Sequence, residues 1–235
     1  STNNEIRRLA EQGAPHGTLA VAERQLGGKG RRGRVWTSPA GVGIWMSMLL
    51  RPQIDPMAAS MLTLVMALST RRGIEKATGL KSEIKWPNDL LLNGKKIVGI
   101  LCEVGPDGHS IVVGIGINLA QPQEYFDAAG LPHGTSLALQ GVSVDMDTDP
   151  EWLAQYMTDF GFDRALYTYE AEGFAPYRER YKALCVNLGR RVTYDGGAGT
   201  AVDVDDEGRL IVRDETGDTR VFTGEVSVKG IYGAV

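Results

Sequence analysis

The sequence predicts an α+β protein with a small β-domain at its C-terminus. Three observations lead to this prediction. Within residues 82–119, two glycine-containing hairpin signals separate three short apolar runs, which is typical of antiparallel strands. Segments with helical patterning lie before and after these runs. From Arg190 onward the chain consists of short alternating stretches separated by glycine or acidic turns, which favours a small barrel.

The first half of the chain is expected to contain a helix, two strands and a second helix. These elements are predicted at about residues 3–12, 17–25, 43–52 and 56–76. Asn3 or Asn4 can cap the first helix, because their side chains accept hydrogen bonds from free N–H groups of the first turn. The helix is expected to end at Gly13. The second strand is continuously apolar and is therefore predicted to be buried. Gly79 ends the second helix.

The second half is expected to contain antiparallel strands, two helices and the C-terminal domain. Asn93-Gly94 and Asp107-Gly108 are the two hairpin turns. Helices are predicted at about 150–171 and 174–184. Five strands then follow, with the sequences RRVTY, TAVDVD, RLIVRD, TRVFTG and EVSVKG. A boundary near residue 187 divides the chain into two domains, residues 1–186 and 187–235.

Composition indicates one large domain with an appendage. The chain has 235 residues, is 43% hydrophobic and carries a net charge of -4, so bulk electrostatics give no reason to expect a nucleic-acid or membrane-surface protein. Cys102 and Cys185 lie outside any CxxC pattern, which argues against a disulfide framework or a zinc site. No apolar run reaches the ~18 residues that span a bilayer, and no secretory signal is evident, so the cytoplasm is the expected location.

A cationic, glycine-rich loop interrupts this acidic chain. The stretch QLGGKGRRGRVW, residues 25–36, holds four cations and four glycines directly before Trp36. One interpretation is a solvated turn whose arginines keep it soluble. The other is an anion cradle, in which glycines let the backbone approach a phosphate, cations neutralise it and Trp36 stacks on a flat group. The loop matches neither the Walker A nor the dinucleotide-binding glycine pattern.

The segment KWPNDLLLNGKKIVGI, residues 85–100, places polar side chains at a bend before a strand. Trp86-Pro87 cannot easily continue a helix, so Asn88 and Asp89 are expected at a rigid turn. An ordinary turn explains the same residues. Lys96 directly precedes an apolar run, where a cation has little structural use, and an edge lysine is the competing explanation.

A third segment, VVGIGINL, has glycines at alternating positions of a strand. Gly114 and Gly116 lie on one face, and Asn118 follows on the same face. Glycine weakens a strand interior unless a ligand or another backbone needs the space. The pattern therefore predicts a flat wall for a bound molecule, with close packing against a helix as the alternative.

Together and in this order, these segments resemble the biotin protein ligases. The similarity covers nearly the whole chain, from Ser1-Thr2-Asn3 through the glycine–arginine loop, KWPND, KIVG and GIGIN to the closing GEVSVKG. It implies a mixed sheet with helices, similar to the catalytic domain of class II aminoacyl-tRNA synthetases, followed by an SH3-like barrel. It also implies two reaction steps: biotin attacks the α-phosphorus of ATP, and the biotinyl-5′-AMP formed then acylates a carrier lysine.

The resemblance assigns site residues by their places in these motifs. The expected catalytic residues are Arg31, Asp89 and Lys96. The expected biotin-binding residues are Ser1, Thr2, Gln25, Gly28, Lys29, Arg31, Lys96, Gly114 and Gly116. The expected ATP- and adenylate-binding residues are Arg31, Arg32, Arg34, Trp36, Asn88, Lys96 and Asn118. Lys96 would stabilise charge at the reacting groups, and Asp89 would orient or deprotonate the incoming lysine.

Substrates and partners follow from the same resemblance. ATP and biotin are the expected substrates, with Mg²⁺ on the phosphates, and the metal ligands are unknown. The expected partner is the biotin carboxyl carrier protein of acetyl-CoA carboxylase, and a homodimer is an open option. No helix-turn-helix pattern precedes Ser1, so DNA binding is not expected and the ligase is expected to be monofunctional. Lys29 stands where the family usually has arginine; lysine lacks the planar fork, so we expect weaker clamping of the ligand.

Two alternatives stay open at this point. A lipoate ligase or octanoyltransferase would share the fold, although the loop, KWPND and the terminal barrel favour biotin. A non-catalytic nucleic-acid-binding module could use residues 29–34, but that patch is short and lacks interleaved aromatic residues.

Overall fold

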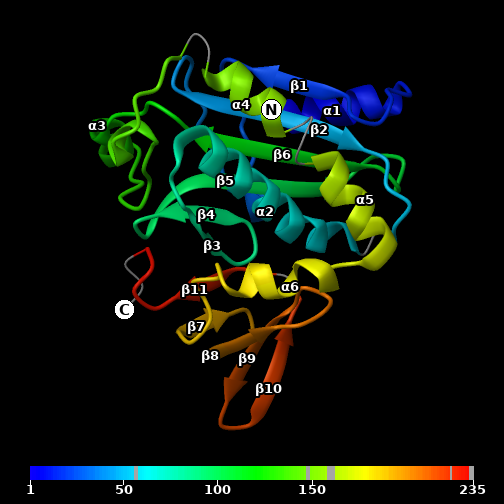
Figure 1. Cartoon of the computed structure of the whole chain (residues 1–235), viewed down its shortest axis with the longest axis vertical. Coiled ribbons are helices and arrows are strands. Elements are labelled where there is room, and N and C mark those ends of the chain that lie inside the picture. Colours follow the sequence, from blue (N-terminus) through cyan, green and yellow to red (C-terminus); the bar gives the residue numbers. More distant parts are fainter. Residues whose placement is uncertain (56–57, 147–148, 158–161, 223, 233–235) are drawn as a thin grey trace.

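The computed structural model describes residues 1–55, 58–146, 149–157, 162–222 and 224–232. Two sheets dominate it, with helices packed on and between them (Figure 1). This confirms the expected α+β class. Within the described residues no helix is long and apolar enough to cross a bilayer.

The larger sheet has six strands in the order β1-β2-β6-β5-β4-β3. Their bounds are β1 Leu19–Ala22, β2 Gly43–Leu50, β3 Glu83–Lys85, β4 Asp89–Leu92, β5 Lys95–Val104 and β6 Ile111–Asn118. All five strand pairs are antiparallel. The parallel part of the expected mixed sheet is confined to two isolated bridges, Ile84 with Cys185 and Lys96 with Gly134. The two predicted hairpin turns join β4 to β5 and β5 to β6, as expected.

The two faces of this sheet are covered differently. The long helix α2, Ala59–Thr78, packs against β4 and β5 on one face, where alternate apolar residues such as Met46, Met48 and Ile115 form the main core. The helix α1, Thr2–Glu11, packs on the other face through Ile6 and Ala10 against Leu49 and Val112. Because side chains alternate along a strand, the residues of β2 and β6 that face α1 also face the candidate site.

The predicted cap of the first helix needs correction. Ser1, rather than Asn3 or Asn4, occupies the cap position of α1, without a side-chain capping bond. Asn3 lies inside the helix and is buried. Its side-chain amide donates a hydrogen bond to Glu103 at 2.7 Å and accepts one from Ser47, so it is not free to cap the helix. Tertiary partners thus outcompete the local cap. For α2, Gly79 ends the helix in a left-handed conformation, as expected, whereas the predicted start at Pro56 lies outside the described residues.

The remaining helices are α3 Gln123–Ala128, α4 Asp149–Met157, α5 Asp163–Glu172 and α6 Ala175–Lys182, with 3-10 turns at Arg31–Gly33 and Ala138–Gln140. Within the helix expected over 150–171, the described residues form α4 and α5, and residues 158–161 between them lie outside the described part of the chain. The predicted helix at 174–184 corresponds to α6. In Figure 1, α6 lies between the two sheets.

The second sheet contains the five predicted strands. They are β7 Arg191–Tyr194, β8 Gly197–Val204, β9 Leu210–Asp214, β10 Gly217–Val221 and β11 Val226–Val228, in the antiparallel order β10-β9-β8-β7-β11. The domain boundary at residues 186 and 187 stays a prediction, since contacts cross it. Trp86 donates its indole N–H to the carbonyl of Gly208 at 3.0 Å.

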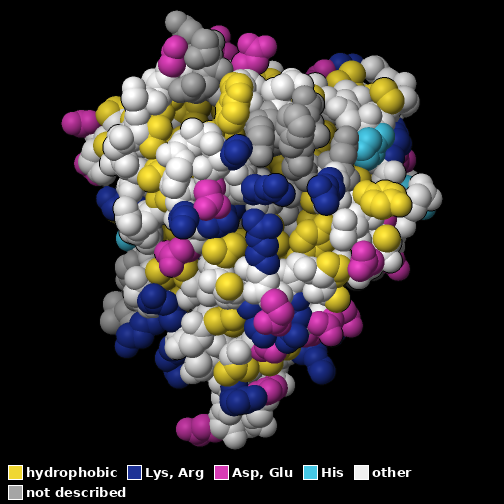
Figure 2. Space-filling view, in the orientation of Figure 1, with side chains coloured by type: hydrophobic (Ala, Val, Ile, Leu, Met, Phe, Trp, Pro, Cys, Tyr) yellow, Lys and Arg dark blue, Asp and Glu magenta, His cyan; other side chains and the backbone are white. Residues whose placement is uncertain are grey.

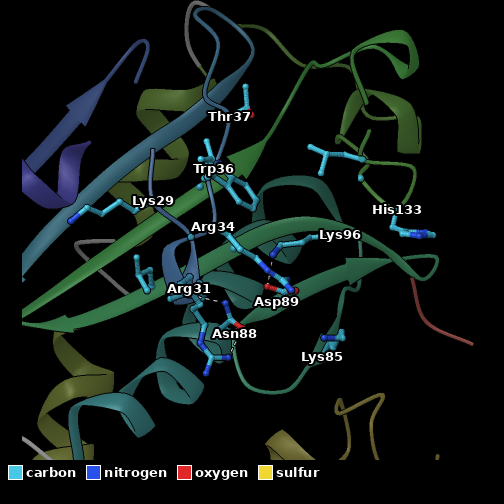
Figure 3. Close-up of a pocket in the computed structure, with 18 of the residues that line it drawn as sticks. Lys29, Arg31, Arg34, Trp36, Thr37, Lys85, Asn88, Asp89, Lys96 and His133 are labelled. Carbon is cyan, nitrogen blue, oxygen red and sulfur yellow. Dashed lines mark hydrogen bonds and ion pairs between the residues drawn. The ribbon is translucent and has the colours of Figure 1, made fainter. Parts of the chain in front are cut away.

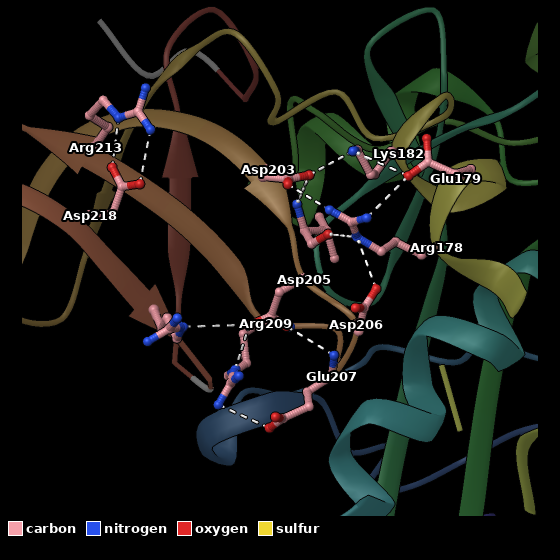
Figure 4. A network of polar contacts seen from close by, with 12 residues as sticks. Arg178, Glu179, Lys182, Asp203, Asp205, Asp206, Glu207, Arg209, Arg213 and Asp218 are labelled. Atoms are coloured by element: carbon pink, nitrogen blue, oxygen red, sulfur yellow. Dashed lines mark hydrogen bonds and ion pairs between the residues drawn. The ribbon is translucent and has the colours of Figure 1, made fainter. Parts of the chain in front are cut away.

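Charged side chains hold α6 to this second sheet. Arg178 donates to the carbonyl of Val204 and to Asp203, both at 2.6 Å, and Lys182 pairs with Asp203 at 2.8 Å (Figure 4). In the space-filling view, cationic and acidic side chains lie side by side in this region (Figure 2). Such partly exposed pairs contribute little individually to stability, so their main effect is to orient the second sheet beneath the first.

Candidate functional site

A cavity of about 500 Å³ lies where the two sheets and the glycine–arginine loop meet. Its lining comes from the loop around residues 29–37, the bend at 85–89, the strands β5 and β6, and the segment 224–232, which contains the strand β11 of the second sheet. Figure 3 shows these elements converging on one space. The volume lies in the range of small-molecule and cofactor sites.

Glycines make one wall of the cavity flat. Gly99 on β5 and Gly116 on β6 are cross-strand partners, and the indole of Trp36 lies against both. A Cβ atom would approach Trp36 to 2.7 Å at Gly99 and to 2.4 Å at Gly116. At Gly114 it would approach Asn3 to 2.1 Å. The glycine face is therefore present: Trp36 of the loop uses the space over Gly99 and Gly116, whereas Asn3 of the packed helix α1 uses the space over Gly114, as the alternative interpretation expected.

Trp36 is held by aromatic and cationic neighbours. Its ring packs edge-on against Trp45 with centroids 6.5 Å apart, and Lys96 Nζ lies 5.0 Å from its ring centroid. Its indole N–H is buried and has no hydrogen-bond partner among the described residues. Burying an unpaired donor is unfavourable, so a ligand acceptor at this position would satisfy it.

Lys96 and Asp89 form an ion pair at the centre of the cavity. The Lys96 Nζ to Asp89 Oδ1 distance is 2.6 Å, and Asp89 is only 7% exposed. Burial favours the neutral acid, but the charges of Lys96 and Lys85 outweigh it and hold the pKa of Asp89 below its usual value. Burial lowers the pKa of Lys85. Asp89 is consequently an anion that accepts hydrogen bonds and is a weak base.

The second oxygen of Asp89 contacts Tyr232, which follows the last strand. The hydroxyl of Tyr232 donates to Asp89 Oδ2 at 3.1 Å. The ring of Tyr232 stacks on His133 with centroids 5.6 Å apart, and Lys85 Nζ lies 5.1 Å from the Tyr232 centroid. All of these groups line the cavity.

Each arginine of the loop has a partner in the C-terminal part of the chain, and Arg31 also has one near the bend at 85–89. Arg31 donates to Asn88 Oδ1 at 3.2 Å and to the carbonyl of Gly224 at 3.0 Å. Burial lowers the pKa of Arg31, although a guanidinium stays charged in proteins. Arg32 pairs with Asp195 at 2.6 Å, and Arg34 pairs with Glu225. The connections of the second sheet thus supply partners for all three arginines.

Another part of the cavity is lined mainly by neutral polar groups, with Lys29 at its edge. Gln25 accepts from the backbone N–H of Thr2 at 2.8 Å and donates to Ser38 at 2.8 Å. Ser1, Thr2, Gln25 and Lys29 line the cavity.

Among the residues that the structure describes, two of the expected ligand-binding residues, Gly28 and Asn118, do not offer a free group to the cavity. Gly28 does not line the cavity in the described part of the chain; it is buried in the loop, where its carbonyl accepts from the N–H of Trp36. Asn118 lines the cavity, but its amide nitrogen donates to Thr135 at 3.0 Å and its oxygen accepts from Gln121 at 2.9 Å. A contact from this amide to adenine stays a prediction.

Several cavity residues were not predicted from the sequence. They are Asn3, Lys85, Gly99, His133, Glu225 and Tyr232. Lys85, Gly99 and Glu225 lie inside the quoted motifs KWPND, KIVG and GEVSVKG, so their motif membership was an available signal. Asn3 looked like a cap, and His133 and Tyr232 reach the cavity only through tertiary contacts.

A metal ion finds no preformed protein site among the described residues. No group of three or more His, Cys, Asp and Glu side chains is arranged to hold one. The two carboxylates that line the cavity, Asp89 and Glu225, are each paired with a cation. A divalent ion at this site would therefore have to take most of its ligands from a bound phosphate and water.

Comparisons with known proteins agree with this geometry. Residues 1–118 match the Biotin/lipoate A/B protein ligase family, and residues 188–229 match the Biotin protein ligase C terminal domain. The biotin–[acetyl-CoA-carboxylase] ligase of Paracoccus denitrificans is 36% identical over 243 residues, which cover 98% of each chain. The bifunctional ligase/repressor BirA of Bacillus spizizenii is 36% identical over 97% of this chain and 71% of its own.

A solved structure has a similar fold. The biotin protein ligase from Aquifex aeolicus in complex with biotin and ATP superposes with a TM-score of 0.79 at 28% identity. The match covers 97% of this chain and 94% of that one. Both sheets therefore have counterparts in that structure.

Proposed function

The chain belongs to the Biotin/lipoate A/B protein ligase family, and from this premise we propose that it is a biotin protein ligase. It activates biotin with ATP as biotinyl-5′-AMP and transfers the biotinyl group to a lysine of a biotin carboxyl carrier protein. The match of residues 188–229 to a biotin protein ligase domain and the full-length similarity to a biotin–[acetyl-CoA-carboxylase] ligase favour biotin over lipoate.

The first step joins two anions and therefore requires concentrated positive charge. A biotin carboxylate oxygen bonds to the α-phosphorus of ATP, and the bond from that phosphorus to the bridging oxygen breaks as pyrophosphate leaves. Lys96 and Arg31 would neutralise the carboxylate and the α-phosphate, because both line the cavity from separate segments. Cations that are already in place stabilise the developing charge without reorganisation. Arg32 and Arg34 would meet the outer phosphates.

The ligand's two ends match two parts of the cavity. The neutral polar part near Thr2, Gln25 and the glycine wall suits the biotin ring system. Trp36 offers a ring face and a buried, unpaired N–H for the adenine. Asn88, which accepts from Arg31, would keep that guanidinium aimed into the cavity.

The second step needs an oriented amine. The neutral lysine nitrogen bonds to the acyl carbon, the bond from that carbon to the phosphate oxygen breaks, and AMP leaves while one amine proton passes to solvent. Asp89 would accept a hydrogen bond from this amine. The lowered pKa of Asp89 makes it a weak base, so the electrostatics favour orientation of the amine over its deprotonation.

Magnesium fits this chemistry as a companion of ATP. Mg²⁺ usually keeps several waters and binds through substrate phosphates with one or two carboxylates. Glu225 and Asp89 are the two carboxylates that line the cavity among the described residues. When bound, the ion would supply charge neutralisation on the phosphates.

The observation that carries this proposal is that Lys96 and Arg31 line one cavity together with Gly114 and Gly116. The test is to incubate the protein with ATP, Mg²⁺ and biotin and to measure biotinyl-5′-AMP by mass spectrometry. Lys96→Ala should lose at least about 100-fold of this product. The matched control is Lys95→Ala on the same strand, which should retain it. Formation of a lipoyl adenylate in preference to the biotinyl adenylate would contradict the proposal.

A further inference from the structure

One side chain in the cavity has no role in either step as described so far. Tyr232 follows the last strand, β11, and the buried Ile231 beside it anchors the turn. Its hydroxyl reaches Asp89 across 143 residues of sequence. The contact joins the segment after β11 to the first residue of β4 in the larger sheet.

Two neighbours, His133 and Lys85, set the position of the Tyr232 ring. His133 stacks on one side of it at an interplanar angle of 28°, and Lys85 lies 5.1 Å from its centroid. The His133 loop is itself fixed, because the carbonyl of His133 accepts from the backbone N–H of Lys96 at 2.7 Å. Burial raises the pKa of Tyr232, so its hydroxyl keeps its proton and donates. The packing of the ring therefore holds the hydroxyl beside Asp89, in addition to the one hydrogen bond between them.

Asp89 has a neighbour at each of its oxygens and is only 7% exposed, which leaves little room for a further donor. Oδ1 contacts Lys96 at 2.6 Å and Oδ2 accepts from Tyr232 at 3.1 Å. An incoming amine needs one of these oxygens. The contact with Lys96 is charge-assisted and short, whereas the contact with Tyr232 has a neutral donor and is longer. The attraction between opposite charges is strong where little water screens it, so the ion pair with Lys96 persists and the tyrosine gives way first.

We propose that Tyr232 is a specificity residue for the transfer step, because its hydroxyl occupies the Asp89 oxygen that the acceptor amine must use. This inference rests on the proposed function. A small amine free in solution has to compete with an intramolecular hydrogen bond. A carrier protein that has docked delivers its lysine at high effective concentration and can displace the hydroxyl. Tyr232 thereby directs the activated acyl group to a docked lysine.

The test compares a small amine with a carrier protein as acceptor. Biotinyl-5′-AMP is first formed on the enzyme and quantified, so that any change in its formation is divided out. Hydroxylamine or a biotin carboxyl carrier protein is then added, and loss of the adenylate is followed. Tyr232→Phe keeps the ring and its packing but removes the hydroxyl. We expect the ratio of the hydroxylamine rate to the carrier rate to rise about three- to tenfold, the factor expected for one hydrogen bond.

Two controls separate this role from a structural one. Tyr177→Phe removes a hydroxyl that donates to Ala165 at 2.8 Å outside the cavity, and it should leave the ratio unchanged. In an Asp89→Asn background, Tyr232→Phe should have no further effect on the ratio, because the carboxylate that the hydroxyl covers is gone. Melting temperatures of all variants are measured beside the rates.

An unchanged or lower ratio in Tyr232→Phe overturns the inference, since the tyrosine would then only position Asp89 or support the fold. The same ratio change in the Asp89→Asn background also overturns it. A wild-type protein that makes no biotinyl-5′-AMP overturns the proposed function itself and this inference with it. A wild-type protein that makes the adenylate but shows no Tyr232 effect overturns the inference alone.

Discussion

The cavity receives its positive charge from two regions that are built in opposite ways. Lys96 stands on β5, in an antiparallel hairpin whose register is set by paired strands, and it pairs with Asp89 of the neighbouring strand. The loop arginines stand in a glycine-rich segment, where Arg32 itself adopts a left-handed conformation with φ 56°. Their partners lie in connections of the second sheet: Asp195 in the turn after β7, and Gly224 and Glu225 directly before β11.

This comparison indicates that the charge of Lys96 is held in place by the sheet, whereas the charges of the loop arginines can move with the loop. The hairpin ion pair is buried and depends on contacts inside the first sheet. The loop pairs are half exposed, with exposed side-chain fractions of 52% for Arg32 and 66% for Arg34. Exposed pairs contribute about 0–1 kcal/mol each, so phosphates can displace these carboxylates. The loop can therefore open for substrates and close over an adenylate, while Lys96 stays in place.

The largest expected effect tests whether the fixed charge depends on exact geometry. Lys96→Arg keeps the charge but enlarges the head group between Asp89 and the ring of Trp36. We expect adenylate formation to fall about 100-fold. Arg34→Lys, the matched change in the loop, should lower it less than about tenfold. Pyrophosphate exchange measures both, and equal losses in the two variants would remove the distinction.

The next expected effect concerns stability and pH. The pKa of Asp89 is lowered in the folded protein, so its ionisation stabilises the fold above its unfolded pKa of ~4 and stops doing so as pH falls through the lower folded value. Asp89→Asn should therefore lower the free energy of unfolding by up to about 3 kcal/mol near pH 7. The difference from wild type should shrink as the pH falls below about 4. Urea unfolding across this range measures it, and a difference that grows on acidification would contradict the assignment.

A smaller effect is expected at the partners of the loop. In the double variant Asp195→Asn/Glu225→Gln, two carboxylates no longer compete with phosphates for Arg32 and Arg34. We expect the KM for ATP to fall about two- to fivefold. Asp218→Asn, which breaks a pair with Arg213 elsewhere in the same sheet, is the control. A higher KM in the double variant would mean that the carboxylates hold the loop in its productive position.

The smallest expected effect is at Lys29. Lysine carries a point charge where the family usually has the bidentate arginine, and Lys29 lines the cavity while remaining exposed. Lys29→Arg should reduce the release of biotinyl-5′-AMP into solution about two- to threefold. Filtration of the enzyme after adenylate formation, followed by mass spectrometry of the filtrate, measures the release. Equal release from both proteins would reject the role of this position.

Much of the fold could be predicted because local chemistry decides it. The hairpins at Asn93-Gly94 and Asp107-Gly108 and the end of α2 at Gly79 follow from turn and cap preferences that act within a few residues. The cap of α1 was predicted wrongly for the complementary reason. Asn3 can cap a helix, but Ser47 and Glu103 are brought to it by the sheet and take its amide.

By itself the sequence determined which chemical groups this protein has and which strands and turns carry them: cations in a glycine loop, an Asp89 after a proline bend, and glycines that leave one strand face flat. Only the tertiary structure decided that Tyr232 covers an oxygen of Asp89, that Asp195 and Glu225 hold the loop, and that Trp36 lies on Gly99 and Gly116. The physical reason is range. Turn and strand preferences act between neighbours in the chain, whereas ion pairs and ring contacts need atoms within a few ångströms, and only the packing of the two sheets brings such distant residues together.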